Sequence, residues 1–177
     1  MQVLNKEAIY KLNSIYTPIT TILDPEDLHI SDKYNLSCFS VFNHRLNNEE
    51  AEQQILFYQQ ALEHGDTPNT KQYYKYHDRL LKFYLDLYNR TTVYGAFGKF
   101  SKRYSNLVEF DNIKEYKSNV LASIREQFFM GIALPEFASI ISGNFDLVHL
   151  LYTLKNRPDG KTKISAIIKE HELFLIS

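Results

Sequence analysis

The sequence predicts a mainly α fold, a single-domain helical bundle around a central helix at about residues 70–90. Apolar and aromatic residues in this stretch lie nearly all round the helical circle, which is typical of a helix packed on several faces. Apolar residues at the same three-to-four spacing recur in other segments of the chain. A length of 177 residues fits one domain, so residues 1–177 are expected to form one globular unit.

The N-terminal residues 5–27 are predicted to form a short helix followed by a turn or a second helix start. Residues 5–16 have apolar positions on one side and Asn5 as a cap, which predicts a short helix. Pro18 ends this helix, because the residue before a proline is pushed out of the helical region. Residues 24–27 (DPED) predict a turn or the start of a helix.

Two further helices are expected before the central one. Residues 34–46 fit a helix, and alternation typical of a strand fits almost as well; we favour the helix. Residues 47–64 form a clearer helical pattern, capped by Asn47 or Asn48 and ended by Gly65. Glutamates fill its first turn, where they face the positive end of the helix dipole.

Residues 91–110 are where β structure is expected, because β-forming residues surround Gly95 and Gly98. A small β element here gives the alternative fold class, α+β. Residues 112–130 again have apolar positions on one helical face, with Asn112 as the cap. A helix is therefore predicted there.

The C-terminal part is predicted to be helical until its last residues. Residues 135–142 fit a short helix, with a hairpin turning at residues 143–144 as the rival interpretation. Polar residues at helical spacing favour a helix over residues 144–154, and residues 162–171 predict a last helix. Residues 174–176 are expected to form a buried tail or an edge strand.

Composition sets the compartment that we expect. The single cysteine, Cys38, cannot form an internal disulfide, so the fold needs no oxidising environment. No apolar run approaches the length of a membrane span. The N-terminal residues lack the basic-then-apolar layout of a signal peptide. We expect a cytoplasmic protein without a membrane partner.

The pair His77-Asp78 is the strongest candidate for metal chemistry. It resembles the central dyad of metal-dependent phosphohydrolases, whose site needs further His and Asp ligands from neighbouring helices. Here only His44, His64 and Asp146 are plausible donors. We favour a histidine on a helix face beside a surface aspartate, so no cofactor, metal or catalytic residue is predicted. A small metal-dependent hydrolase is the alternative.

A short basic cluster suggests a second alternative function, that of a nucleic-acid-associated regulator. Lys99, Lys102 and Arg103 alternate with Phe100 and Tyr104, a pattern that suits phosphate pairing and base stacking. The cluster is small and the whole chain has a formal net charge of −1. A solvated edge strand is the favoured interpretation, and nucleic acid is not expected as a partner.

Acidic residues concentrate in the first part of the chain. Residues 1–70 contain 10 Asp and Glu against 4 Lys and Arg, whereas residues 71–177 contain 11 against 16. Such asymmetry is an argument about partners rather than about fold. A merely solvated surface is the simpler interpretation, and docking onto a basic protein is the functional one. The carboxylates expected to bind such a partner are Asp24, Glu26, Asp27, Glu49, Glu50 and Glu52.

A small chain rich in Tyr and Asn, with an acidic face and no catalytic motif, resembles the immunity proteins of bacterial toxin systems. These include the immunity proteins of contact-dependent growth inhibition. The resemblance is one of overall character, so it covers no specific stretch and transfers no residue. It implies a non-enzymatic protein that neutralises a cognate toxin, such as a basic nuclease, by covering its active site.

Overall fold

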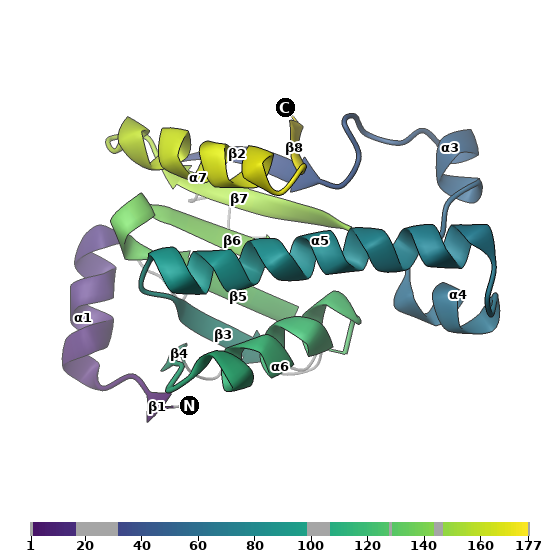
Figure 1. The fold of residues 1–177 in the computed structure, drawn as a ribbon. Coiled ribbons are helices and arrows are strands. Elements are labelled where there is room, and N and C mark those ends of the chain that lie inside the picture. The colour runs from purple at the N-terminus through teal and green to yellow at the C-terminus, as the bar shows by residue number, and fades with distance from the viewer. Residues whose placement is uncertain (1, 17–31, 99–106, 128, 144–146, 177) are drawn as a thin grey trace.

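The computed structural model describes residues 2–16, 32–98, 107–127, 129–143 and 147–176. Within these residues, eight strands form one antiparallel sheet in the order β1-β4-β3-β5-β6-β7-β2-β8 (Figure 1). The predicted mainly α bundle is therefore wrong, because a sheet forms the middle of the molecule. The strands are β1 (Gln2–Val3), β2 (Tyr34–Ser40), β3 (Tyr94–Gly98), β4 (Leu107–Glu109), β5 (Phe129–Leu134), β6 (Ser139–Gly143), β7 (Val148–Leu154) and β8 (Phe174–Ile176).

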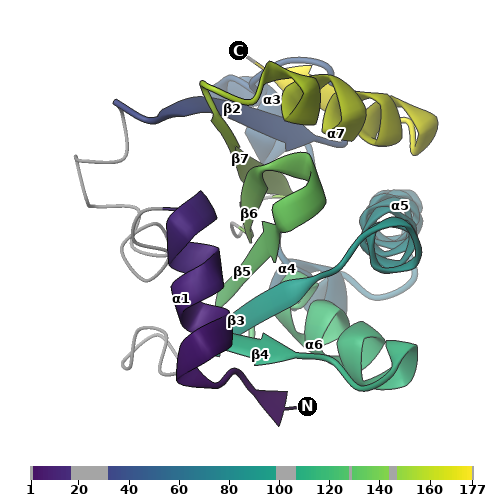
Figure 2. The same ribbon diagram turned by 90° about the vertical axis from the view of Figure 1, so that its left-hand side faces the viewer.

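Helices cover the sheet from both sides, as the two views of the ribbon show (Figures 1 and 2). Helix α1 lies against one face, and α5, α6 and α7 lie against the other. The short helices α3 and α4 lie at one end of the molecule, beside the first turns of α5. The helices are α1 (Lys6–Ile15), α3 (Asn48–Glu52), α4 (Tyr58–Glu63), α5 (Pro68–Arg90), α6 (Ile113–Ile124), the 3-10 turn η2 (Pro135–Phe137) and α7 (Pro158–Glu170).

The predicted central helix exists as α5, with a start slightly earlier than expected. Thr67 caps it, because its side chain accepts a hydrogen bond from the backbone N–H of Thr70, and Pro68 occupies the first turn. Its inner side is buried through Tyr73, Leu80 and neighbouring residues. Its outer side is exposed, so α5 lies along one face of the sheet and is not surrounded by other helices.

Buried apolar side chains form one core on each face of the sheet. The larger core fills the space under α5, α6 and α7 and includes Phe39, Leu80, Phe83, Tyr116, Ile141 and Ile164. The smaller core lies under α1 and includes Leu12, Tyr16, Ile140 and Tyr152. The Tyr16 hydroxyl, which follows α1, donates a hydrogen bond to the carbonyl of Ser139 at the start of β6 (3.2 Å).

Strand β7 shows why the prediction of a helix at residues 144–154 is wrong. Leu151 packs into the larger core, while Leu150 and Tyr152 pack toward the smaller one. A strand buried on both faces carries apolar residues at successive positions, so its sequence lacks the period of two that marks a half-exposed strand. The residues that looked helical by spacing, His149 and Thr153, are buried polar residues of this strand.

Strand β2 overturns the helix predicted at residues 34–46. Its pairing with β7 runs from Tyr34 to Ser40, and β8 pairs with its second half. The weaker strand interpretation is therefore the correct one for this segment. Tertiary pairing decided between two patterns that fitted almost equally well.

Other predicted boundaries change for local reasons. The helix expected at residues 47–64 is interrupted and forms α3 and α4. The helix expected at residues 112–130 ends at Ile124, and Glu126 then takes a left-handed backbone conformation (φ 60°) ahead of β5. The segment 135–142 forms η2 and β6, and the antiparallel pairing of β6 with β7 favours the rival hairpin.

Several predictions of local structure are confirmed. Helices α1 and α7 match the segments 5–16 and 162–171, and α7 begins earlier, at Pro158. Strands β3 and β4 lie within the segment 91–110 and pair with each other. Strand β8 is the predicted edge strand. No helix in the described ranges has both the length and the apolar character that crossing a membrane requires.

Candidate functional site

Helix α3 carries the three predicted partner-binding carboxylates that the structure describes. Glu49 and Glu52 are exposed, and neither has a hydrogen bond or ion pair with another described residue. Glu50 instead forms hydrogen bonds with Asn47 and His44. We use the name acidic segment for residues 47–66, which contain α3 and α4. Asp24, Glu26 and Asp27 lie outside the described residues.

Glu50 has a structural role that fixes the start of α3. The Asn47 side chain accepts a hydrogen bond from the Glu50 backbone N–H (3.0 Å), and Glu50 Oε2 accepts one from the Asn47 backbone N–H (2.9 Å). Glu50 Oε1 lies 3.0 Å from Nε2 of His44. The hydrogen bond from the Asn47 backbone, followed by the one with His44, lowers the pKa of Glu50. Glu50 therefore holds the orientation of α3, and Glu49 and Glu52 remain available to a partner.

Polar contacts join the acidic segment to α5 and to the end of α6. The backbone N–H of Tyr58, at the start of α4, donates to Glu126 Oε1 (3.2 Å). The guanidinium of Arg125 lies 5.2 Å from the centre of the Tyr58 ring. Asn69 Nδ2, in the first turn of α5, donates to the carbonyl of Gln53 after α3 (3.3 Å). These contacts give the exposed carboxylates a defined position relative to the core.

More carboxylates lie at the same end of the molecule. Glu63 at the end of α4 and Asp66 before α5 are exposed. Glu63 accepts a hydrogen bond from Gln59 (3.2 Å), and Asp66 forms an ion pair with Lys71 (3.2 Å). Both interactions are at the surface, where water competes with them, so both carboxylates still contribute negative potential. Figure 1 shows α3 and α4 together at this end.

The dyad His77-Asp78 does not have the geometry of a metal site. His77 is only 4% exposed and faces inward from α5, whereas Asp78 is exposed on the outer side. His77 Nδ1 lies 3.9 Å from Asp78 Oδ1. Burial, followed by the nearby charge of Arg125, lowers the pKa of His77. These observations match a core histidine beside a surface aspartate.

Two of the additional ligands that the hydrolase hypothesis requires have other hydrogen-bond partners. His44 contacts Glu50, and His64 Nδ1 bonds with the carbonyl of Gln60 (2.8 Å). Asp146 lies outside the described residues. Among the residues that the structure describes, no three His, Cys, Asp or Glu side chains group to hold a metal ion. The basic cluster Lys99, Lys102 and Arg103 also lies outside the described residues.

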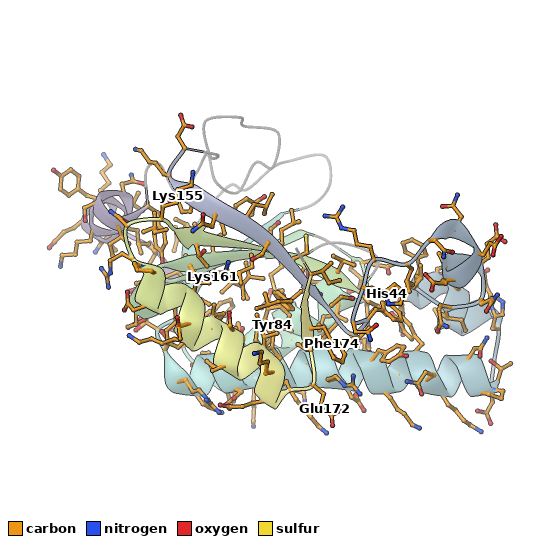
Figure 3. All side chains as sticks on the ribbon, turned by 90° about the horizontal axis from the view of Figure 1, so that it is seen from above. His44, Tyr84, Lys155, Lys161, Glu172 and Phe174 are labelled. Carbon is orange, nitrogen blue, oxygen red and sulfur yellow. The ribbon has the colours of Figure 1, made fainter. Side chains whose placement is uncertain are left out.

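A second histidine, which the sequence did not single out, lies deeper in the core. The Tyr84 hydroxyl and His149 Nδ1 are hydrogen-bonded at 2.6 Å, and the His149 ring stacks on Phe39 with centroids 5.2 Å apart. Burial lowers the pKa of His149 to about 3, so the ring is neutral. Figure 3 shows Tyr84 between α5 and the strands. This pair joins α5 to β7 inside the larger core and is not accessible to a substrate.

Charged residues also connect α5 with α7 at the surface. His171 Nε2 lies 2.8 Å from Asp86 Oδ2, and Arg90 bridges Asp86 (2.9 Å) and Glu170 (2.6 Å). Burial raises the pKa of Asp86, but the hydrogen bonds from His171 and Arg90 outweigh it and lower the pKa overall. Every charge in this network has a partner of opposite sign. The network therefore suits a clamp between helices better than a binding site.

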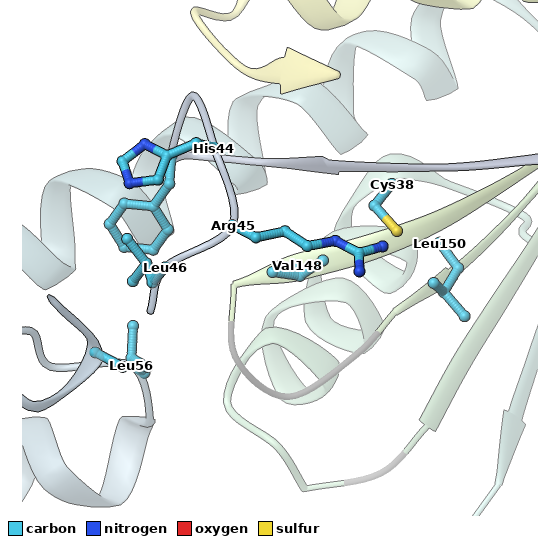
Figure 4. Close-up of a pocket in the computed structure, with 9 residues that line it drawn as sticks. Cys38, His44, Arg45, Leu46, Leu56, Val148 and Leu150 are labelled. Carbon is cyan, nitrogen blue, oxygen red and sulfur yellow. The ribbon is translucent and has the colours of Figure 1, made fainter. Parts of the chain in front are cut away.

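A pocket beside α3 was also missed from the sequence. Its lining comes from β2, the turn after it, α3, the link between α3 and α4, and β7, and includes Cys38, Arg45 and Leu150 (Figure 4). Cys38 and Leu150 are partners in the β2–β7 ladder although they are far apart in the chain. Only the strand pairing brings these residues together, so no local pattern signals the pocket.

Comparisons with protein-family models, with curated proteins and with solved structures find no match for this chain. The site must therefore be interpreted from its own geometry and charge.

Proposed function

We propose that this chain is a non-enzymatic protein-binding domain, an immunity protein that neutralises a cognate toxin by covering its active site. The observation that carries the proposal is the display of Glu49 and Glu52 on α3. Both are exposed and without partners among the described residues, on a helix whose orientation is fixed by the capping box of Asn47 and Glu50. Exposed carboxylates on a helix of fixed orientation suit a partner with a basic surface.

The charge of the neighbouring residues supports the same partner. Glu63 and Asp66 add negative potential at this end of the molecule, and the ion pair of Asp66 with Lys71 is exposed. Complementary charges increase the rate of encounter and select among partners more than they add affinity. A nuclease domain, which must bind the phosphates of nucleic acid, presents a basic active-site surface of the required sign. The proposed compartment of the encounter is the cytoplasm.

The test is co-expression with the candidate toxin encoded by the neighbouring gene. We expect cells that produce this chain to grow when the toxin is produced, and the two purified proteins to elute together as a stoichiometric complex. A variant of the toxin with an inactive catalytic residue is the control for toxicity of the toxin itself. Growth arrest despite full expression of this chain, together with no complex, would contradict the proposal.

A further inference from the structure

The pocket beside α3 is built mainly from apolar side chains and has a volume of about 380 Å³. Its floor is the face of β7 that carries Val148 and Leu150, and Leu46 and Leu56 form part of its wall. Each of these four side chains is half-buried, so part of its apolar surface faces the pocket. A volume in this range holds a small organic ligand.

One cation reaches into this apolar space. Figure 4 shows the Arg45 side chain extending over the strands, with its guanidinium toward Cys38 and Leu150. Arg45 has no ion pair or hydrogen bond with another residue that the structure describes. The nearby carboxylate of Glu50 is already held by His44 and by the Asn47 backbone. The five N–H donors of the guanidinium are therefore available to a ligand.

The charged residues that line the pocket also indicate the charge of the ligand. No Asp or Glu is among the described residues that line the pocket, so these residues offer a bound cation no counter-charge. Glu49 and Glu52 lie on α3 but point their charge into solvent, where water and salt reduce its effect on the pocket. Arg45 thus selects for an anion, and its planar group pairs best with a carboxylate or another two-oxygen acid.

We propose that this pocket binds a small carboxylic acid with an apolar tail. The carboxylate pairs with the guanidinium of Arg45, and the tail lies on Val148 and Leu150 and against Leu46 and Leu56. Apolar contact supplies affinity in proportion to the area removed from water, and the charge-assisted hydrogen bonds fix the orientation of the ligand. This site does not depend on the protein partner proposed above.

Cys38 provides a direct readout of occupancy, because it lines the pocket and is the single cysteine of the chain. The rate at which a thiol reagent modifies Cys38 is measured in the full-length protein with increasing octanoate. We expect octanoate to slow the modification with saturation, and octanol to do so more weakly. Octylamine, which has the same tail and the opposite charge, should give no protection.

The variant Arg45→Gln tests the role of the guanidinium. We expect it to weaken protection by octanoate roughly tenfold, as for the loss of one charge-assisted hydrogen bond, and to leave protection by octanol within about twofold. Arg157→Gln, which changes an exposed arginine outside the pocket, should behave like the wild type. Equal protection by octanoate in Arg45→Gln and wild type would overturn the proposal, as would protection by octylamine or no protection by octanoate.

The variant Val148→Phe gives an independent check. The larger ring fills part of the floor, so octanoate should protect Cys38 less, while the unfolding temperature measured without ligand shows whether the fold is intact. Bound octanoate should also raise the unfolding temperature of the wild type, because it binds the native state. Faster modification of Cys38 in octanoate together with a lowered unfolding temperature would show detergent-like unfolding and would overturn the proposal.

Discussion

The inner side of α5 and the acidic segment are stabilised in different ways. The inner side of α5 buries Tyr73, Leu80, Phe83 and Tyr84 against the sheet, each at most 1% exposed. In the acidic segment α3 buries no residue and α4 buries only Ala61, among the residues described. Between the two helices, Ile55 is also buried and joins the larger core together with Ala61. Extensive side-chain packing thus holds the first region, whereas a few packed residues, caps and hydrogen bonds hold the second. Under the proposed function, stability and recognition therefore depend on different parts of the molecule.

The largest expected effect is a loss of stability from a substitution on the buried side of α5. Phe83 is fully buried and lies 5.0 Å from the Phe39 ring, centroid to centroid, so Phe83→Ala leaves a cavity between α5 and β2. We expect a loss of about 3–5 kcal/mol in the free energy of unfolding, measured by urea denaturation. Leu62→Ala, at a 52% exposed position of α4, should change it by less than about 0.5 kcal/mol.

Equal losses in the free energy of unfolding from these two variants would contradict the distinction between the packed core under α5 and the exposed surface of α4. A loss in Leu62→Ala alone would mean that α4 is part of the cooperative core. Phe83→Ala removes about twice as many side-chain carbon atoms as Leu62→Ala, so a contrast well beyond twofold reports burial rather than side-chain size.

Part of this comparison was predictable from the sequence. Helix α5 was predicted because its apolar spacing is a local signal, whereas its cap at Thr67 and its start at Pro68 were not predicted. The same is true of the cap at Asn47, where the side chains of Asn47 and Glu50 interact over a single turn. The exposure of Glu49 and Glu52 follows directly from that local structure, whereas Glu50, which was predicted alongside them, is half-buried and hydrogen-bonded to Asn47 and His44.

The sheet was not predictable by the same route. Strands β6 and β7 are buried on both faces, and their apolar residues do not alternate with polar ones. Their strand conformation depends on pairing with each other and, for β7, with β2. The pocket depends on the same long-range pairing, since Cys38 and Leu150 meet only across the β2–β7 ladder.

The next largest expected effect is a dependence of stability on pH that comes from the core. The pKa of His149 is about 3 in the folded protein, against an ordinary value of 6.5. The unfolded chain therefore binds more protons between these values, and stability falls as the pH drops below about 6.5. Each pH unit in this window costs about 1.4 kcal/mol at most. The lowered pKa of His77 acts in the same direction.

Urea denaturation at neutral pH and near pH 5, about one and a half units below the ordinary His value, measures this effect. The carboxylates with lowered pKa values, such as Asp86, lose their stabilising charge only at lower pH, so this window isolates the histidines. His149→Gln stays neutral at both pH values and should show a clearly smaller pH dependence. The same dependence in the variant and the wild type would contradict a buried neutral His149.

The smallest expected change in stability belongs to α3, and it accompanies the most direct test of the proposed function. In the double variant Glu49→Lys/Glu52→Lys, exposed carboxylates become cations, and the free energy of unfolding should change little. The new lysine at position 49 faces the positive end of the helix dipole, so the unfolding temperature is measured alongside. A matched control is Glu7→Lys/Glu109→Lys, which reverses two exposed charges away from α3.

The deciding measurement is the association rate of each variant with the toxin that co-expression identifies, followed as a function of salt concentration. If the carboxylates of α3 steer a basic partner, Glu49→Lys/Glu52→Lys should associate at least about tenfold more slowly at low salt. The difference from wild type should shrink as salt is added, and the control pair should stay close to wild type. A folded double variant that associates at the wild-type rate, with the wild-type dependence on salt, would contradict the account.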